Sequence, residues 1–215
     1  MISKRLLAIA SFIDIDDKLI DVGCDHGYLG IYLKNNNLCR DMLLTDLRES
    51  ALNNAISNIK KNNLDIKTFK TDGLNNIDLN NYNCICISGM GTSTIIEILS
   101  LLNGNSSIKK IIIQSNNDLD ILRKEMINYG YYLDDEITVK ENDIYYIICK
   151  FTKVKKQINS NELLFGINKE DKKEYYNYLL SNYNDILNKI PDGNKDKNEI
   201  IKKINILNKL LKECR

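Results

Sequence analysis

Hydrophobic positions change their spacing in a regular way over about the first 130 residues. Short apolar runs, typical of buried β-strands, alternate with segments whose apolar residues recur every three or four positions, as in helices. The predicted strands are 18–22, 42–46, 66–72, 84–88 and 109–116. The predicted helices are 27–36, 48–63, 92–103 and 118–131, with an amphipathic helix at the N-terminus and with Asp118 and Gly130 capping the last helix. This order predicts an α/β fold, in which a parallel sheet carries helices on both faces.

The pattern changes twice after these units. Residues 133–151 have the pattern of two strands around a tight turn at 141–143, so we expect the sheet to end in an antiparallel hairpin. Ordinary dinucleotide dehydrogenases rarely end in this way. Beyond residue 170, two apolar stripes step by four and three residues, at Tyr176, Leu180, Tyr183, Leu187 and Ile190 and at Ile200, Ile204, Leu207, Leu211 and Cys214. With a turn at 191–194 between them, they predict a small helical coiled-coil hairpin.

Composition narrows the class of protein. The chain has 215 residues, of which 43% are hydrophobic and 27% charged, as in globular proteins. No apolar run approaches the roughly 20 residues of a membrane span, and the N-terminus lacks a signal-peptide pattern. Six cysteines without a C-x-x-C pair, together with a single histidine, favour reduced thiols in a cytoplasmic protein with no metal site.

Charge is spread unevenly along the chain. Residues 1–151 carry 16 Lys and Arg against 20 Asp and Glu, whereas residues 152–215 carry 14 against 9. A basic C-terminal region suggests a polyanionic partner, although lysines also solvate helix faces. We expect one domain at 1–155 and a helical hairpin at 156–215.

Polar or glycine-rich segments follow all five predicted parallel strands. They are Asp21–Gly27, Asp46, Asp72-Gly73, Ser88–Gly91 and Gln114–Asn116. Because the carboxyl ends of parallel strands meet at one edge of a sheet, these segments are expected to form one ligand site.

The first of these segments, Asp21–Gly27, indicates the type of ligand. Asp21-x-Gly23-x-Asp25-x-Gly27 lacks the full G-x-G-x-x-G phosphate cradle, and its two aspartates would repel a pyrophosphate. They suit a cation such as S-adenosylmethionine, which carries a sulfonium and an ammonium group. His26 lies within the loop and is a candidate for the ligand shell.

The other strand ends are each open to a second interpretation. Asp46 fits an acceptor for ribose hydroxyls or a helix cap, and Asp72 fits an adenine-amino contact or an Asp-Gly turn. Ser88–Gly91 would let the backbone approach a ligand next to Met90, or would form a tight turn with Met90 in the core. Asn116 would face the site or only begin the next helix.

Several motifs together resemble one enzyme family. They are SKRL (3–6), DVGCDHGYL (21–29), TD (45–46), DGL (72–74), ISGMG (87–91) and IQSN (113–116). With the two-helix tail, the chain resembles the bacterial tRNA (adenine(22)-N(1))-methyltransferases, which are class I S-adenosylmethionine-dependent enzymes with a Rossmann-like sheet. Two positions depart from the family's usual GMGG and Q-P-N, namely Thr92 and Ser115. The lost proline is expected to loosen the loop that carries Asn116.

The resemblance implies a function and a set of site residues. The cofactor would bind at Asp21, Gly23, Cys24, Asp25, His26, Gly27, Asp46, Leu47, Asp72, Gly73, Ser88 and Gly89. The tRNA would contact Lys4, Arg5, Tyr28, Met90, Gly91 and Asn116, and the catalytic candidates are Asp25, Ser88 and Asn116. We expect a monomer that methylates N1 of adenine 22. The alternatives are a non-enzymatic RNA- or partner-binding scaffold and an NAD-dependent dehydrogenase.

Overall fold

A computed structural model describes residues 2–102, 104, 107–191, 194 and 196–214. The chain divides after Gln157 into two compact units, which are described separately below. Within the described residues, no helix is long and apolar enough to cross a membrane.

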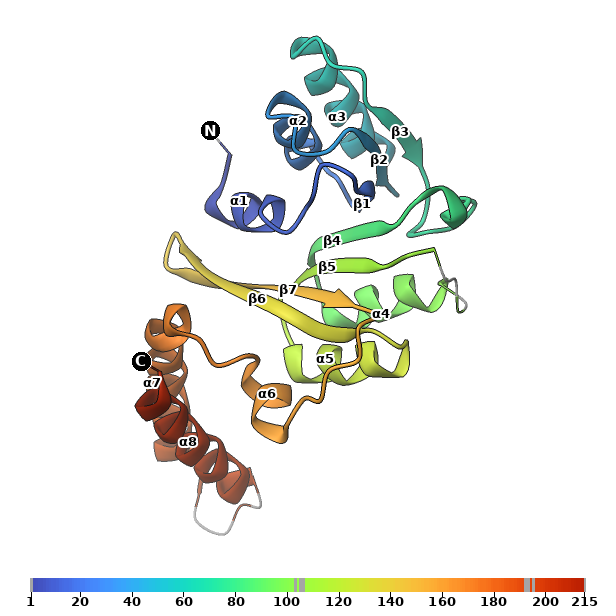
Figure 1. Ribbon diagram of the computed structural model, residues 1–215. Helices are drawn as coiled ribbons and strands as arrows, with labels where there is room; N and C mark the ends of the chain where they lie inside the picture. The colour runs from blue at the N-terminus through green and yellow to red at the C-terminus, as the bar shows by residue number, and fades with distance from the viewer. Residues whose placement is uncertain (1, 103, 105–106, 192–193, 195, 215) are drawn as a thin grey trace. The chain divides into compact units, whose positions relative to one another are not determined.

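A seven-stranded sheet forms the centre of the first unit, in the order β3-β2-β1-β4-β5-β7-β6 (Figure 1). The strands are β1 (Lys18–Val22), β2 (Asp41–Asp46), β3 (Lys67–Lys70), β4 (Cys84–Met90), β5 (Lys110–Ser115), β6 (Tyr132–Glu141) and β7 (Ile144–Thr152). Strands β1 to β5 pair in parallel, and β7 is antiparallel to both β5 and β6. The predicted α/β class and the terminal antiparallel hairpin are therefore confirmed.

Helices cover both faces of the sheet (Figure 1). They are α1 (Lys4–Ala10), α2 (Tyr28–Asn35), α3 (Glu49–Lys61), α4 (Thr92–Ser100) and α5 (Leu119–Asn128), with a short 3-10 turn at Leu79–Asn81. On one face, α1, α2 and α3 share a core with alternate strand residues that include Leu19, Cys84, Cys86 and Ile112. Figure 1 places α4 and α5 on the other face. The six cysteines are free, and Cys84 and Cys86 both belong to the core on this face.

Three local predictions differ from the structure. The N-terminal helix spans only seven residues, and β4 continues two residues beyond Ser88 because its pairing with β5 shifts register between Ser88 and Met90. Asp118 precedes α5 as predicted, but its side chain makes no cap bond. Its backbone is left-handed (φ 48°), and its carboxylate accepts from Asn117 Nδ2 at 2.6 Å instead.

The second unit is helical and has its own small core. It contains α6 (Ser160–Phe165), a 3-10 turn at Glu170–Lys172, α7 (Lys173–Lys189) and α8 (Asp196–Glu213). Its buried apolar residues are Phe165, Tyr176, Leu207 and Leu210. Helices α7 and α8 pack against each other, as their stripes predict. Supercoiling of the pair stays a prediction, and the turn expected at 191–194 lies partly outside the described residues.

Helix α6 overlaps, at Ser160 and Asn161, the end of the stretch 152–161, whose polar composition is typical of a linker. Asn159 and Glu162 form a capping box there, in which each side chain bonds the other residue's backbone N–H. Since these bonds satisfy donors that a helix start otherwise leaves exposed, they explain why so polar a segment begins a helix.

A buried ion pair joins α5 to the edge strand β6. Arg123 donates from Nε and Nη2 to Glu136 Oε1 at 2.9 and 2.7 Å, and the side chains are 2% and 0% exposed. The Cys149 thiol donates to the same oxygen at 3.1 Å. Because two charges are removed from water here, each depends on the other for its stabilisation.

Replacing one partner should therefore cost more than replacing both. Arg123→Met should lower the free energy of unfolding by about 3–5 kcal/mol, because it leaves a buried carboxylate without its partner. Arg123→Met with Glu136→Gln should recover part of that loss. Urea denaturation of the three proteins would measure this, and a double variant no more stable than the single one would contradict it.

Candidate active site

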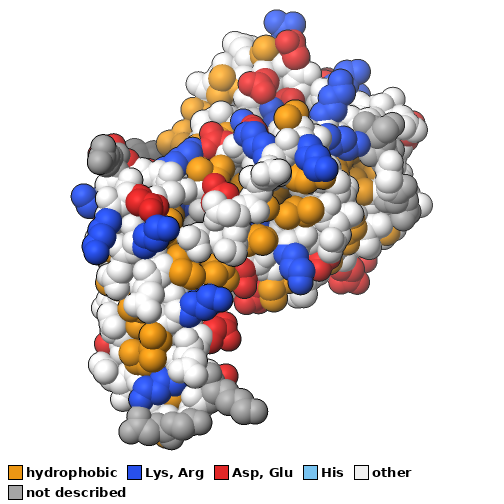
Figure 2. Space-filling view, turned by 60° about the horizontal axis from the view of Figure 1, so that its bottom comes forward, with side chains coloured by type: hydrophobic (Ala, Val, Ile, Leu, Met, Phe, Trp, Pro, Cys, Tyr) orange, Lys and Arg blue, Asp and Glu red, His pale blue; other side chains and the backbone are white. Residues whose placement is uncertain are grey.

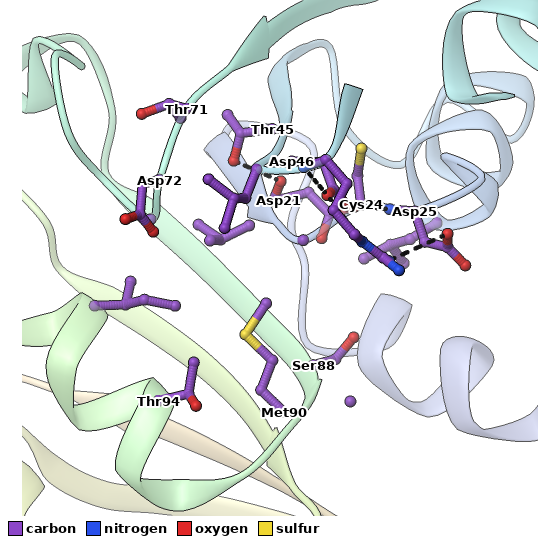
Figure 3. Close-up of a pocket in the computed structure, with 18 of the residues that line it drawn as sticks. Asp21, Cys24, Asp25, Thr45, Asp46, Thr71, Asp72, Ser88, Met90 and Thr94 are labelled. Carbon is purple, nitrogen blue, oxygen red and sulfur yellow. Dashed lines mark hydrogen bonds and ion pairs between the residues drawn. The ribbon is translucent and has the colours of Figure 1, made fainter. Parts of the chain in front are cut away.

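A cavity of about 860 Å³ lies at the carboxyl ends of the parallel strands (Figure 3). Most residues proposed from the sequence line it, namely Arg5, Asp21, Gly23, Cys24, Asp25, His26, Tyr28, Asp46, Leu47, Asp72, Gly73, Ser88, Gly89 and Met90. Lys4, Gly27, Gly91 and Asn116 are not part of the lining. The ends of β1 to β4 thus converge on one site, whereas no residue of the predicted segment Gln114–Asn116 lines it.

The loop after β1 brings its backbone close to the cavity. Gly23 adopts φ +75°, and a Cβ built there would lie 2.3 Å from Met90 Cε. The N–H groups of Gly23 and Cys24 both donate to Thr45 O at 2.9 Å, which fixes the loop to the end of β2. Only glycine fits this approach without displacing Met90.

Gly27 has a different role from the one proposed. It is buried at the start of α2, where an added Cβ would lie 3.1 Å from Ala55 Cβ and 3.2 Å from Leu44 Cδ2. Its left-handed backbone (φ +71°) and this tight packing require glycine, although the residue lies outside the lining of the cavity.

Two buried carboxylates stand at the ends of β1 and β2. Asp21 is 3% exposed and Asp46 is 5% exposed. Burial, and next the negative charge of Asp46, raise the pKa of Asp21 to about 7, while a hydrogen bond from Cys86 opposes the shift. Burial also raises the pKa of the Cys24 thiol, so this cysteine stays neutral. The first loop is therefore surrounded by acidic side chains, and Asp21 among them holds its proton up to about neutral pH.

Asp46 holds the neighbouring loops in place. Its Oδ2 accepts from the N–H of Asp25 at 3.1 Å, and its Oδ1 accepts from the N–H of Arg48 at 2.9 Å. Arg48, not Asp46, occupies the cap position of α3, and it makes no side-chain cap bond. The helix-cap interpretation of Asp46 is therefore wrong.

The rim of the cavity is charged and partly aromatic. Asp25 is exposed and lies 3.8 Å from Arg48 Nη2 and 3.6 Å from His26 Nε2. The His26 ring stacks on Tyr28, with centroids 5.3 Å apart. Arg48 was not proposed from the sequence, although its place two residues after Asp46 at a strand end was an available signal.

Helix α4 supplies a wall that the sequence analysis missed. Thr94, Glu97, Ile98 and Leu101 line the cavity together with Thr71 and Asn75 from the loop after β3. These four residues follow the helical spacing of three, one and three, so they share one face, and Ser100 also lines the cavity. Gly73, with φ +58°, lies under this wall, and a Cβ there would meet Ile98 Cγ1 at 3.1 Å.

The end of β4 contains a bulge at Gly89. Ser88 pairs with Gln114 and Met90 pairs with Ser115, so Gly89 (φ +79°) has no ladder partner. Asn116 is exposed and donates from Nδ2 to Gly89 O at 2.9 Å. Asn116 therefore bonds to the bulge and does not line the cavity.

Thr92 and Ser115, the two residues that depart from the family motifs, contact each other. Thr92 Oγ1 lies 2.8 Å from Ser115 Oγ, and both residues are buried. Thr92 Oγ1 also donates to Asn117 O at 2.6 Å. The Ser115 hydroxyl ties the loop to the start of α4, while the expectation that the lost proline loosens this loop stays a prediction.

Lys4 does not contact the cavity with its side chain. Its backbone N–H donates to Glu141 Oε1 at 2.9 Å, which fixes the start of α1 to the end of β6. Within the described residues, no group of three or more His, Cys, Asp and Glu side chains could hold a metal ion.

Comparisons with known proteins agree on the enzyme class. A family model described as "Methyltransferase domain" matches residues 2–149. TrmK of M. capricolum, solved in complex with S-adenosyl-homocysteine, is 31% identical with a TM-score of 0.88, and the match covers 100% of both chains. This chain belongs to the TrmK family of methyltransferases. A dehydrogenase is therefore no longer a competing interpretation.

Further relatives extend the comparison. A Mycoplasma genitalium protein, whose name provisionally describes it as a tRNA methyltransferase, is 30% identical over 97% of this chain and 96% of its own length. The Bacillus subtilis tRNA (adenine(22)-N(1))-methyltransferase is 28% identical over 66% of this TrmK-family chain and 60% of its own.

The raised pKa of Asp21 predicts how stability depends on pH. Unfolded, this carboxyl titrates near 3.9, so between about pH 4 and pH 7 the folded protein holds a proton that the unfolded chain releases. Stability from this group is therefore lost as pH rises toward 7. Relative to wild type, Asp21→Asn should gain about 2–3 kcal/mol between pH 5 and pH 8.

Urea denaturation at both pH values, without cofactor, would measure the gain. Asp72→Asn, which removes an exposed carboxylate from the same cavity, is the matched control and should parallel wild type. If the free energy of unfolding changed equally with pH in Asp21→Asn and in wild type, the raised pKa of Asp21 would be contradicted.

Proposed function

We propose that this protein transfers the methyl group of S-adenosylmethionine to N1 of adenine 22 in tRNA. The observation that carries the proposal is membership of the TrmK family over the full length of the chain, together with a cavity lined by residues from five of the six motif segments. The Bacillus subtilis relative is named for this reaction.

The chemistry of the cavity fits the cofactor. S-adenosylmethionine supplies a methyl group on a cationic sulfonium. The buried carboxylates of Asp21 and Asp46 suit a ligand with a sulfonium and an ammonium group, and both line the cavity together with Gly23. Asp72, exposed at the opposite side of the lining, is the proposed partner of the adenine amino group.

Methylation of N1 needs positioning more than proton transfer. Adenine N1 carries a free lone pair, so no strong base is required, and alignment of the two reactants supplies most of the rate. The product is cationic until it loses an amino proton, so an oxygen acceptor near the base helps. Among the three catalytic candidates, Ser88 is best supported because it is half-buried in the lining.

The other two candidates fit supporting roles better. Asp25 is exposed and close to Arg48 and His26, so it suits the approach of the substrate. Asn116 bonds Gly89 O and suits a role in shaping the segment after β4. We propose Met90 and Tyr28 as the surface that receives the unstacked target base.

We propose that 1–155 carry the methyl transfer and that 156–215 handle tRNA in a monomeric, cytoplasmic enzyme. Exposed lysines on α7 and α8 suit phosphate contacts, which give affinity without reading sequence. On the face drawn in Figure 2, basic side chains are mixed with acidic and apolar ones and do not form one continuous patch.

The direct test is methylation of tRNA transcripts that differ only at nucleotide 22. With adenine there, mass spectrometry should find one N1-methyladenosine, and with guanine there, none. Isothermal titration should find binding of S-adenosylmethionine and not of NAD. Cofactor binding without any methylation would favour the scaffold alternative, and methylation at another adenine would overturn the position.

The helical unit should be separable from cofactor binding. Deletion of residues 158–215 should weaken tRNA binding at least tenfold and reduce its salt dependence, because phosphate contacts are lost. The affinity for S-adenosylmethionine should stay within about twofold, because the residues that line the cavity all precede residue 102. Gel-shift and calorimetric titrations would measure both, and loss of cofactor binding would show that the tail is structural.

A further inference from the structure

The side chain of Gln114 is buried behind the cavity at the end of β5. It is 1% exposed and does not line the cavity. Its Oε1 accepts from Arg5 Nη1 at 2.8 Å and from the Gly89 N–H at 3.1 Å. Its Nε2 donates to Asn116 Oδ1 at 3.0 Å. One amide therefore joins α1, the bulge after β4 and the loop after β5.

The bulge depends on side chains for its hydrogen bonds. Gly89 has no partner in the β4–β5 ladder, so its N–H and C=O lack the bonds that a regular strand supplies. Gln114 accepts from the N–H, and Asn116 donates to the C=O at 2.9 Å. Because they satisfy both backbone groups of Gly89, these two side chains stabilise the bulged conformation.

The bulge determines where the residues on either side of it point. Ser88 and Met90 both reach the cavity from the end of β4 (Figure 3). The Met90 methyl lies against Gly23, as the 2.3 Å to a Cβ built there indicates. Ser88 and Met90 are two residues apart and would share a face of a regular strand, and the bulge shifts Met90 into register with Ser115, which sets its position relative to Ser88.

The same amide also fixes the cation at the edge of the cavity. Arg5 lines the cavity with its guanidinium carbon 5.4 Å from the centre of the Tyr146 ring. Its Nη1 lies 3.1 Å from the position of a Cβ on Gly89. Only one orientation of the Gln114 amide accepts from Arg5 and Gly89 while donating to Asn116, so all three contacts are set together.

We propose that Gln114 is a positioning residue for methyl transfer, acting through the Gly89 bulge and Arg5. The inference rests on the proposed function and deepens it, since it concerns how the same site holds the target base against the methyl donor. Gln114 touches neither reactant, and the segment that contains Ser88 and Met90 depends on it.

The test compares two substitutions by steady-state kinetics on tRNA. Gln114→Leu removes all three bonds and should lower kcat on the order of 10²-fold, because small displacements of reacting groups are costly. The KM for S-adenosylmethionine should change by less than about twofold. Gln114→Glu has the same shape and keeps the acceptor for Arg5 and Gly89 but loses the donor to Asn116, so its kcat should be intermediate.

Ile112→Val, a buried change on the same strand, is the matched control and should keep wild-type kcat. Gln114→Leu with Asn116→Ala should be no slower than Gln114→Leu alone, since both act on one bulge. If Gln114→Leu does not fold, Gln114→Glu carries the test.

Wild-type kcat in the Gln114 variants, or a loss of cofactor affinity as large as the loss of kcat, would overturn the positioning role. If the wild-type protein does not methylate tRNA, the proposed function is rejected together with the role of Gln114. If the wild-type protein is active and only the Gln114 variants behave differently from the expectation, the role of Gln114 alone is rejected.

Discussion

The burial of two carboxylates at adjacent strand ends is the constraint on which the site depends. Parallel pairing of β1 with β2 brings Asp21 and Asp46 to the same edge, where the negative charge of Asp46 disfavours the ionised form of Asp21. Asp46 is satisfied by two backbone N–H groups, which hold the flanking loops, while the pKa of Asp21 rises. The fold thus carries an unfavourable charge arrangement that a cationic ligand would relieve, as is common at functional sites.

The opposite side of the cavity is ordered by hydrogen bonds and not by charge. The Gly89 bulge, held by Gln114 and Asn116, lies between the two β4 residues, Ser88 and Met90, that line the cavity. The Thr92 and Ser115 hydroxyls fasten the start of α4 to the end of β5 next to it. The two sides meet where Met90 contacts Gly23, so the geometry of each depends on the other.

Sequence patterns predicted the strand ends well because parallel pairing alone brings such residues together. Asp21, Asp46, Asp72 and the segment after β4 could be placed at one edge from strand order only. The wall from α4 was missed although its spacing marks one helix face, because that face looks like ordinary core packing. The role of Gln114 could not be predicted, since it depends on a one-residue register shift that leaves no trace in hydrophobic periodicity.

The helical unit illustrates a second limit of sequence patterns. Stripes that step by four and three residues specify that two helices bury a common face, and Tyr176 and Leu207 do so. The same stripes do not reveal α6, whose polar residues begin a helix because Asn159 and Glu162 cap it. Since caps act through local backbone geometry, short helices of this kind are recognised from residue spacing at their ends. A polar segment beside a helical hairpin should therefore be searched for a capping box before it is assigned as a linker.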